Sequence, residues 1–331
     1  MLKRIAITGS SGYLGTKLVE YARREFPGVQ ILGLDLKPPT TAPTDVFVQA
    51  DIRSPDVTVA LQAFSPDTVI HSAFVFQPMH DDGLMRSINI DGCRNLLSAV
   101  AELQPIRCHL VSSATAYGAW PDNAMPIPED WPVRGRPEFR YSADKAEVEK
   151  IVAQFAVEQP SVEVSWTRPA VIVGPNMDNY VRRFIFGMPL LVRLDGCDTP
   201  LQFVHEDDVT SAIFTILNRN GRGSFNVGPN DWLTASDIAK ATQRRMISLP
   251  FWLARYATSL AWWLRLPIHE FPSGFLYFCR YPWVVQSDRL TSELGFCFQY
   301  SCRETLDLFL ANQTQQKLQK LQTKQTETAR Q

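Results

Sequence analysis

Short apolar runs alternate with longer amphipathic stretches through the first half of the chain. Helices are predicted at 84–103 and 139–159. Because the apolar runs are apolar on both faces, they fit the interior of a parallel sheet that helices cover on both sides. The pattern therefore predicts an α/β fold with a doubly wound parallel sheet. The runs predicted to be strands lie at 30–34, 46–49, 68–71, 108–112 and 162–167.

The pattern changes after Pro169. A stretch rich in glycine, proline and asparagine at 174–179 leads into short elements. The segments 202–204 and 224–227 are predicted to be strands on either side of one more helix, and the remainder is predicted to be mainly helical.

A chain of 331 residues is long enough for two domains. We expect a first domain at 1–173, to which 201–228 returns. A smaller, mainly helical substrate-binding domain is expected from 174–200 and 229–311. Residues 312–331 are rich in glutamine, threonine and lysine, and they are expected to form a polar, disordered tail.

Three glycines follow the apolar run that ends at Thr8. Gly9, Gly12 and Gly15 stand at three-residue spacing before a helical stretch, and Asp35 ends the next apolar run, 20 residues after Gly15. In a dinucleotide site the first glycine makes a sharp turn, the second leaves room for the pyrophosphate, and the third lets the helix pack on the strand. The pyrophosphate then lies at the helix N-terminus, and the acid faces the adenosine ribose. The first domain is therefore predicted to be an NAD-binding Rossmann domain.

A second group of residues is suited to proton transfer. Tyr141 and Lys145 are four residues apart on a predicted helix, so their side chains share one face. A lysine ammonium favours the phenolate and lowers the pKa of a tyrosine, which makes it a usable acid and base in carbonyl–alcohol chemistry. Ser113 follows the predicted strand 108–112, at the sheet edge where ligands bind, and could hydrogen-bond the same substrate oxygen. By itself, Ser113 could equally be a helix or turn cap.

Composition and charge exclude several other classes. The formal net charge is −1 and the basic residues are scattered, so no nucleic-acid partner is predicted. The six cysteines form no CxxC pair and no spacing with histidine typical of a metal site. We therefore predict no metal, and reduced thiols in a cytoplasmic protein. The N-terminus is not expected to be a cleavable signal peptide.

These motifs resemble those of extended short-chain dehydrogenases/reductases in the NAD-dependent epimerase/dehydratase family, over most of residues 2–310. Ser113, Tyr141 and Lys145 match the family's catalytic triad, and the segment 8–15 fits its glycine motif. Further matches are Asp51-Ile52 near the adenine, His71-Ser72-Ala73 beneath the cofactor, Asn89 in a helix, Arg168-Pro169 beside the nicotinamide, and Phe203–Val209 near the substrate cleft.

The resemblance implies how the cofactor is bound and used. Tyr141 is expected to take a proton from a substrate hydroxyl as hydride passes to the nicotinamide, while Ser113 holds the oxygen and Lys145 also binds the ribose. Asp35 favours NAD over NADP because a carboxylate repels a 2′-phosphate, although Lys37 leaves dual use open. The residues expected to bind the cofactor are Gly9, Ser11, Gly12, Tyr13, Leu14, Gly15, Asp35, Asp51, Ile52, Ser72, Ala73, Asn89, Tyr141, Lys145 and Pro169.

Two departures from the family pattern concern the substrate. Enzymes that act on nucleotide sugars commonly carry an arginine at the place of Leu201, and a leucine cannot neutralise a pyrophosphate. Phe74-Val75-Phe76 stands where a family epimerase would carry a lysine. Arg182, Arg183 and Arg193 could compensate, so the sequence weakens a sugar nucleotide as substrate without eliminating it.

The region 248–285 is rich in aromatic residues. Its apolar stretch is interrupted by arginines, bounded by prolines, and shorter than the ~20 apolar residues of a membrane span. Three interpretations remain open: the core of a substrate-domain lid, a hydrophobic substrate pocket, and peripheral attachment to a membrane through 249–266.

The sequence thus predicts an NAD-dependent oxidoreductase or epimerase that interconverts a secondary alcohol and a ketone, on a lipophilic or non-nucleotide small molecule. One alternative is a nucleotide-sugar 4-epimerase or dehydratase. An alternative of another class is a dinucleotide-binding sensor or scaffold without catalysis. A homodimer through the helices 84–103 and 139–159 is expected, although their apolar residues could face only the sheet.

Overall fold

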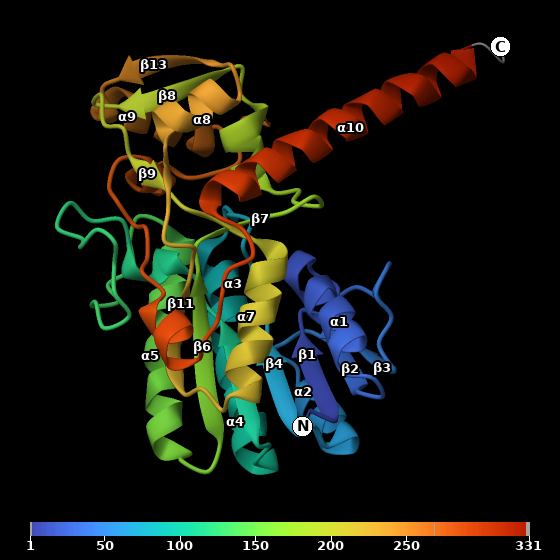
Figure 1. Ribbon diagram of the computed structural model, residues 1–331. Coiled ribbons are helices and arrows are strands. Elements are labelled where there is room, and N and C mark those ends of the chain that lie inside the picture. The colour runs from blue at the N-terminus through green and yellow to red at the C-terminus, as the bar shows by residue number, and fades with distance from the viewer. Residues whose placement is uncertain (1, 268, 329–331) are drawn as a thin grey trace.

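The computed structural model describes residues 2–267 and 269–328. Figure 1 shows a large sheet flanked by helices, with a second lobe at one end of its strands. The sheet has seven parallel strands in the order β11-β6-β5-β4-β1-β2-β3. Their bounds are β1 (Arg4–Thr8), β2 (Gln30–Asp35), β3 (Val46–Gln49), β4 (Thr68–His71), β5 (Arg107–Val111), β6 (Glu163–Pro169) and β11 (Gly223–Val227).

Helices cover both faces of this sheet, which confirms the predicted Rossmann-type fold. Successive residues of β1 point to opposite faces. Ile5 and Ile7 pack with the apolar residues of one pair of helices, whereas Ala6 packs with those of three others. The first pair is α1 (Tyr13–Glu25) and α7 (Glu206–Asn218), and the other three are α2 (Asp56–Phe64), α4 (Gly92–Leu103) and α5 (Arg140–Glu158).

The predicted helix at 84–103 is divided in the structure. It comprises α3 (Asp82–Arg86), a π-helical turn over Ser87–Asp91, and α4. Such turns often lie at functional sites because the wider turn redirects side chains. The predicted helix at 139–159 is α5, and the apolar residues of α4 and α5 that are buried pack against the sheet.

Outside the seven-stranded sheet, the chain forms short helices and paired strands, many of which lie in the second lobe. Three two-stranded sheets join β7 to β10, β8 to β13, and β9 to β12. The strands are β7 (Val171–Val173), β8 (Leu190–Leu194), β9 (Pro200–Leu201), β10 (Phe203–His205), β12 (Leu233–Thr234) and β13 (Arg245–Leu249). The helices are α6 (Tyr180–Arg182), α8 (Ala235–Ala241) and α9 (Phe251–Trp263), with a 3₁₀ segment at Ser273–Cys279 and a π-helical turn at Arg183–Gly187. A further π-helical turn, Arg289–Glu293, lies beside β11 of the large sheet.

The end of the chain differs from the sequence-based expectation of a disordered tail. Helix α10 spans Cys302–Thr328, and its outer part projects away from the body (Figure 1). Its first turns are anchored by Leu306 and Phe309, which are buried. The segment is poor in apolar residues, but it contains no glycine or proline and many glutamine, lysine and leucine residues, which favour a helix. Residues 329–331 of the predicted tail lie outside the described residues.

Candidate active site

A cleft of about 690 Å³ lies at the carboxyl ends of the central strands, with the second lobe forming its other wall. It brings together most of the residues that the sequence singled out. Of the predicted cofactor residues, only Ser11 and Asn89 are absent from its lining. Those that line it are Gly9, Gly12, Tyr13, Leu14, Gly15, Asp35, Asp51, Ile52, Ser72, Ala73, Tyr141, Lys145 and Pro169, and Ser113 lines it as well.

The glycine motif makes the close approaches that its spacing predicts. Gly9 has φ +70°, and a Cβ there would lie 2.7 Å from the backbone nitrogen of Ala73. A Cβ on Gly15 would lie 1.9 Å from the carbonyl oxygen of Gly9. The first turn of α1 can therefore pack against the glycine turn only because residue 15 has no side chain. At Gly12 the single near atom is Gly9 O, at 3.2 Å. The side of Gly12 that faces the cleft is therefore open, which fits the pyrophosphate of a dinucleotide.

Ser11 orients the acid at the end of β2. Its backbone N–H donates to Asp35 Oδ2 at 3.0 Å, and its hydroxyl donates to the carbonyl oxygen of Lys37 at 2.7 Å. Ser11 thus supports Asp35, which itself lines the cleft. A carboxylate fixed in this way fits the ribose hydroxyls of NAD.

Asp51 is held by a neighbouring arginine. Its Oδ2 lies 2.7 Å from Arg53 Nη2, and this ion pair keeps the pKa of Asp51 below its ordinary value. The carbonyl oxygen of Ile52 accepts a hydrogen bond from Asn95 Nδ2 at 2.8 Å. The backbone at Asp51 and Ile52 is therefore held by Asn95 of α4 and by Arg53 of the same loop.

Asn89 lies behind the cleft wall, in the π-helical turn. Its Oδ1 accepts the backbone N–H of Val75 at 2.8 Å, and its Nδ2 donates to Asp144 Oδ2 at 3.0 Å. Asn89 therefore ties the loop after β4 to α5, next to Lys145. This position gives it a supporting role rather than a cleft contact.

The proposed proton-transfer residues meet in the middle of the cleft. Ser113 follows β5, and its Oγ accepts hydrogen bonds from the backbone N–H and the hydroxyl of Thr115, at 3.2 and 3.0 Å. Burial raises the pKa of Tyr141 to about 12, and the hydroxyls of Ser113 and Thr115 oppose part of this rise. The sequence analysis did not include Thr115 among the site residues. The one feature of the sequence that could have indicated it is its position two residues after Ser113.

Lys145 lies on the same wall. Its Nζ donates to the carbonyl oxygen of Val111 at 2.8 Å and lies 5.7 Å from the centre of the Tyr141 ring. Burial lowers the pKa of Lys145 to about 7, although the carboxylate of Glu149 acts in the opposite direction. A buried lysine of this kind can exchange a proton near neutral pH.

His71 is buried beneath the cleft. Its Nδ1 lies 2.7 Å from Thr8 Oγ1, and the backbone N–H of Ala73 donates to the same hydroxyl at 3.3 Å. Complete burial lowers the pKa of His71 to about 3. The pair joins the ends of β1 and β4 beneath the cleft.

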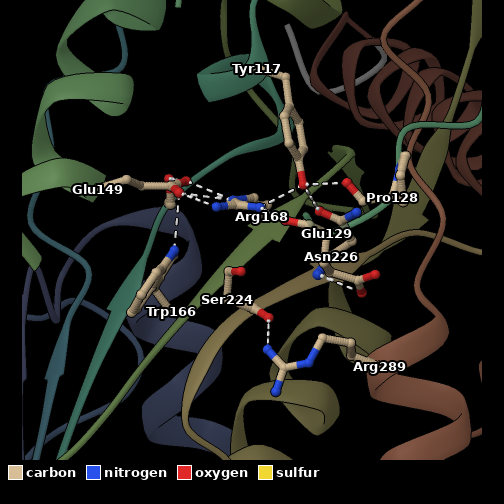
Figure 2. A network of polar contacts seen from close by, with 10 residues as sticks. Tyr117, Pro128, Glu129, Glu149, Trp166, Arg168, Ser224, Asn226 and Arg289 are labelled. Carbon is tan, nitrogen blue, oxygen red and sulfur yellow. Dashed lines mark hydrogen bonds and ion pairs between the residues drawn. The ribbon is translucent and has the colours of Figure 1, made fainter. Parts of the chain in front are cut away.

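A buried polar network supports the ends of β5 and β6, and sequence reasoning did not find it. Glu149 on α5 and Arg168 on β6 form an ion pair, with Nη2 and Oε2 2.6 Å apart (Figure 2). Arg168 Nη1 also donates to the Tyr117 hydroxyl at 2.6 Å, and Tyr117 donates to Asn226 Oδ1 at 2.9 Å. Glu149 further accepts from Ser112 Oγ at 2.5 Å. The network therefore fixes the residues directly before Ser113 and Pro169.

The half of the cleft beyond Tyr141 is apolar. The rings of Phe74 and Phe76 stand edge-on to Tyr141, with centroids 5.6 and 5.1 Å away. Leu201 lines the same space. Further apolar lining comes from Met177, Tyr180, Val181, Phe184, Ile185, Met188, Leu190, Leu191, Val192, Ile238, Phe275, Phe278 and Trp283.

Few charges face this half of the cleft. Over residues 2–267 and 269–328, Lys145 is the only cationic side chain in the lining. Arg182 and Arg183 pair instead with Asp178, and Arg183 also pairs with Glu270. Arg193 does not line the cleft either. In the same part of the chain, no cluster of three or more histidine, cysteine, aspartate or glutamate residues could hold a metal ion.

Comparisons with known proteins agree with this geometry. Residues 5–228 match the profile of the NAD dependent epimerase/dehydratase family. An uncharacterized protein of Mycobacterium tuberculosis strain H37Rv is 26% identical over 267 residues, which cover 79% of this chain and 69% of that protein. The family match confirms the resemblance drawn from the sequence and the predicted cofactor, NAD.

Solved structures share the fold. A short-chain dehydrogenase/reductase superfamily protein from Agrobacterium tumefaciens, with bound NAD, superposes with a TM-score of 0.75 at 18% identity, over 96% of this chain and 99% of that one. The UDP-glucose 4-epimerase of Thermotoga maritima, with UDP-glucose, superposes with a TM-score of 0.70 at 17% identity, over 95% and 99% of the two chains. At these identities the likeness concerns the fold alone.

Proposed function

Because the chain belongs to the NAD-dependent epimerase/dehydratase family, we propose that it interconverts a secondary alcohol and its ketone, on a lipophilic substrate. NAD supplies the hydride-accepting nicotinamide when it is bound. The glycine turn at Gly9, Gly12 and Gly15, together with Asp35, would hold it.

The protein's own residues would move the proton. Tyr141 lies where Ser113 and Thr115 hydroxyls lower its pKa against the effect of burial. We assign Tyr141 as the group that exchanges a proton with the substrate oxygen, and Ser113 as the hydrogen-bond donor to that oxygen. Lys145, whose Nζ lies 5.7 Å from the centre of the Tyr141 ring, would favour the deprotonated form of Tyr141 when it is charged.

The apolar wall around Tyr141 is the observation that supports a lipophilic substrate. Phe74, Phe76 and Leu201 line the cleft at places where, by the family resemblance, enzymes acting on nucleotide sugars commonly carry a lysine or an arginine. Lys145 is the sole cation among the described lining residues. Binding a diphosphate away from water requires charge-assisted hydrogen bonds, for which arginine is best suited. An apolar cleft with a few polar groups instead suits a lipophilic alcohol or ketone.

The test begins with the dinucleotide. The purified protein is denatured and any released cofactor is identified, and a panel of lipophilic secondary alcohols is then screened for NAD reduction. With the substrate found, Tyr141→Phe should reduce turnover by about 10²–10⁴-fold while NAD binding persists. Tyr21→Phe is the matched control, because the Tyr21 hydroxyl lies 3.4 Å from Ser211 Oγ, on α1 and away from the cleft. Unchanged turnover in Tyr141→Phe would exclude the assigned mechanism.

A nucleotide-sugar 4-epimerase or dehydratase is the second candidate, favoured by the shared fold of the Thermotoga maritima enzyme. It predicts NAD that purifies with the protein in stoichiometric amount and saturable binding of UDP. An empty site that takes up NAD freely and does not bind UDP would favour the dehydrogenase.

A dinucleotide-binding sensor without catalysis is less well supported, because Ser113, Tyr141 and Lys145 are all present and meet in the cleft. No turnover with any substrate, combined with tight NAD binding, would favour it. A homodimer and a cytoplasmic location stay predictions, and the mass in solution and cell fractionation would check them.

A further inference from the structure

We propose that the exposed face of helix α9 binds the surface of an anionic lipid bilayer. This α9 face consists of Trp252, Tyr256, Leu260 and Trp263, at positions i, i+4, i+8 and i+11 of one helix. Their side chains are 70%, 67%, 43% and 77% exposed, respectively. Helical spacing places all four on one stripe.

Helix α9 packs against the rest of the protein, so the exposure of the α9 face is not caused by a helix that lacks contacts. Phe251 at the first turn is buried and lies 5.1 Å, between ring centres, from Tyr277. At the other end, the Trp262 ring stacks on His80 with centroids 3.9 Å apart. The helix therefore packs by one side and presents the other side, with its two tryptophans, to solvent.

Neighbouring residues extend the apolar surface. Further exposed apolar side chains lie on α9, on the strand that precedes it and just after its end, and a large exposed apolar patch marks an interaction site. These residues are Ile247, Leu253, Leu264 and Leu266, each at least 40% exposed.

The charge around the α9 face indicates an anionic partner. The sequence from 238 to 269 contains no aspartate or glutamate, but it contains Lys240, Arg244, Arg245, Arg255 and Arg265. The acids that flank this segment or contact it are engaged elsewhere. Asp195, whose Oδ1 accepts the backbone N–H of Phe251 at 2.8 Å, forms an ion pair with Arg280. Asp237 closes a capping box with Thr234, and Glu270 pairs with Arg183.

These charges favour a bilayer over a second copy of the chain. A two-fold contact through the α9 face would bring Arg255 and Arg265 of the two copies together, while Asp195, the acid in contact with the first turn, is already paired with Arg280. An interfacial helix with tryptophan, tyrosine and leucine on its apolar face and arginine at its margin has the composition of a peripheral membrane anchor. Anionic headgroups would attract the arginines, and the aromatic rings would insert at their level. No helix in the described part of the chain is long and apolar enough to cross a membrane, so the contact would be peripheral.

The α9 face also belongs to the lobe that forms the apolar wall of the cleft. Leu190, Leu191 and Val192 of β8 line the cleft, β8 pairs with β13, and β13 leads directly into α9. Contact with a bilayer would place this wall beside a source of lipophilic molecules. That consequence rests on the proposed function, whereas the binding itself does not.

The test is flotation of the full-length protein with vesicles of phosphatidylcholine alone, or of phosphatidylcholine and phosphatidylserine in equal parts. We expect flotation with the anionic vesicles, weakened by salt because the attraction is screened. The double variant Trp252→Ser/Trp263→Ser should lose affinity by about tenfold or more, since two inserted rings are removed. Arg255→Glu/Arg265→Glu should lose binding to the anionic vesicles as well. Val157→Ser, a 76% exposed valine on α5, is the control and should bind as the unchanged protein does.

Three outcomes would overturn the proposal. The first is no flotation with anionic vesicles, and the second is flotation that the tryptophan double variant does not weaken. The third is that the unchanged protein is a dimer that does not bind vesicles, whereas the tryptophan double variant is a monomer. The third result would identify the α9 face as an interface between copies. NAD affinity is measured on every sample, because a variant that binds NAD normally is folded. If such a variant no longer binds vesicles, the result concerns the membrane contact alone and does not bear on the proposed reaction.

Discussion

The Nζ atom of Lys145 lies 3.5 Å from the centre of the Phe74 ring. Phe74 comes from the loop after β4 and Lys145 from α5, so the contact joins two separate walls of the cleft. The ring excludes water from the lysine, which retains the Val111 carbonyl oxygen as its hydrogen-bond acceptor. This burial explains why the pKa of Lys145 falls to about 7. The charged form of Lys145, which the proposed mechanism uses, is therefore costly to maintain in the folded protein.

Replacing Lys145 should reveal this cost as a dependence of stability on pH. In the folded protein the pKa is about 7, compared with an ordinary value of 10.5. Between these values the unfolded chain binds more protons than the folded one, so the stability of the wild type rises with pH, and below pH 7 the cost is present in full. Lys145→Met should therefore exceed the wild type in unfolding free energy by on the order of a few kcal/mol below pH 7. The difference should shrink as pH rises toward 10.

Urea unfolding at several pH values would measure the effect. Lys150→Met is the matched control, because Lys150 is an exposed lysine on the same helix. A difference between Lys145→Met and the wild type that stays constant with pH would show that Lys145 keeps its ordinary pKa.

Removing the charge of Glu149 should destabilise the fold strongly. Glu149 and Arg168 are 4% and 5% exposed, and Glu149→Gln would leave the Arg168 guanidinium buried without its counter-charge. The loss of a partner in such a pair costs about 3–5 kcal/mol. Thermal or urea unfolding would measure it. Glu147→Gln, which breaks a partly exposed pair with Arg86, should cost at most about 1 kcal/mol. Equal losses in the two variants would contradict a structural role for the network in Figure 2.

The sheet and the glycine turn at one end of the cleft followed from local patterns in the sequence. Each strand of a parallel sheet is a short apolar run, and the glycine motif lies within one strand–turn–helix unit, so neighbours along the chain determine both. The carboxyl ends of parallel strands meet at one edge. This is why Ser113, although far from Gly9 in sequence, could be placed near it.

The supporting contacts depended on tertiary packing. Glu149 and Arg168 meet across α5 and β6, and no periodicity indicates which of many charged residues will be buried together. The π-helical turn at Ser87–Asp91 likewise holds Asn89, which bonds to Val75 and Asp144 from distant parts of the chain. For α10, low apolar content suggested disorder, whereas the absence of helix-breaking residues let the helix continue.

A methyl group at Gly15 should disrupt the start of α1. The Cβ of Gly15→Ala would lie 1.9 Å from the carbonyl oxygen of Gly9, so the helix must move away from the turn. We expect a stability loss of about 1–3 kcal/mol, as for other overpacked sites, and a marked loss of NAD affinity. Gly187→Ala is the control, because its Cβ would meet Arg183 Cβ at an ordinary 3.8 Å. If Gly15→Ala bound NAD as the control does, the turn would not be the pyrophosphate site.

The choice between NAD and NADP should depend on the charge of Asp35. Its carboxylate has two functions that substitution can separate: it accepts the backbone N–H of Ser11 at 3.0 Å, and it would face the ribose of the cofactor. Asp35→Asn retains an acceptor oxygen for Ser11 but removes the charge that repels a 2′-phosphate. Asp35→Ala removes both. Hydrogen bonds to charged groups contribute about 1.5–3 kcal/mol, so NAD affinity should fall by roughly 10- to 100-fold in Asp35→Ala.

Titration of each variant with NAD and with NADP, followed by fluorescence, would give the two affinities. Asp35→Asn should bind NADP more tightly relative to NAD than the wild type does, because the repulsion is gone while the loop of Ser11 stays in place. Asp35→Ala should show the same change in preference with weaker binding overall. If the NAD-to-NADP ratio is the same in all three proteins, Asp35 does not face the ribose. The specificity would then have to come from Lys37 or from another residue at this end of the cleft.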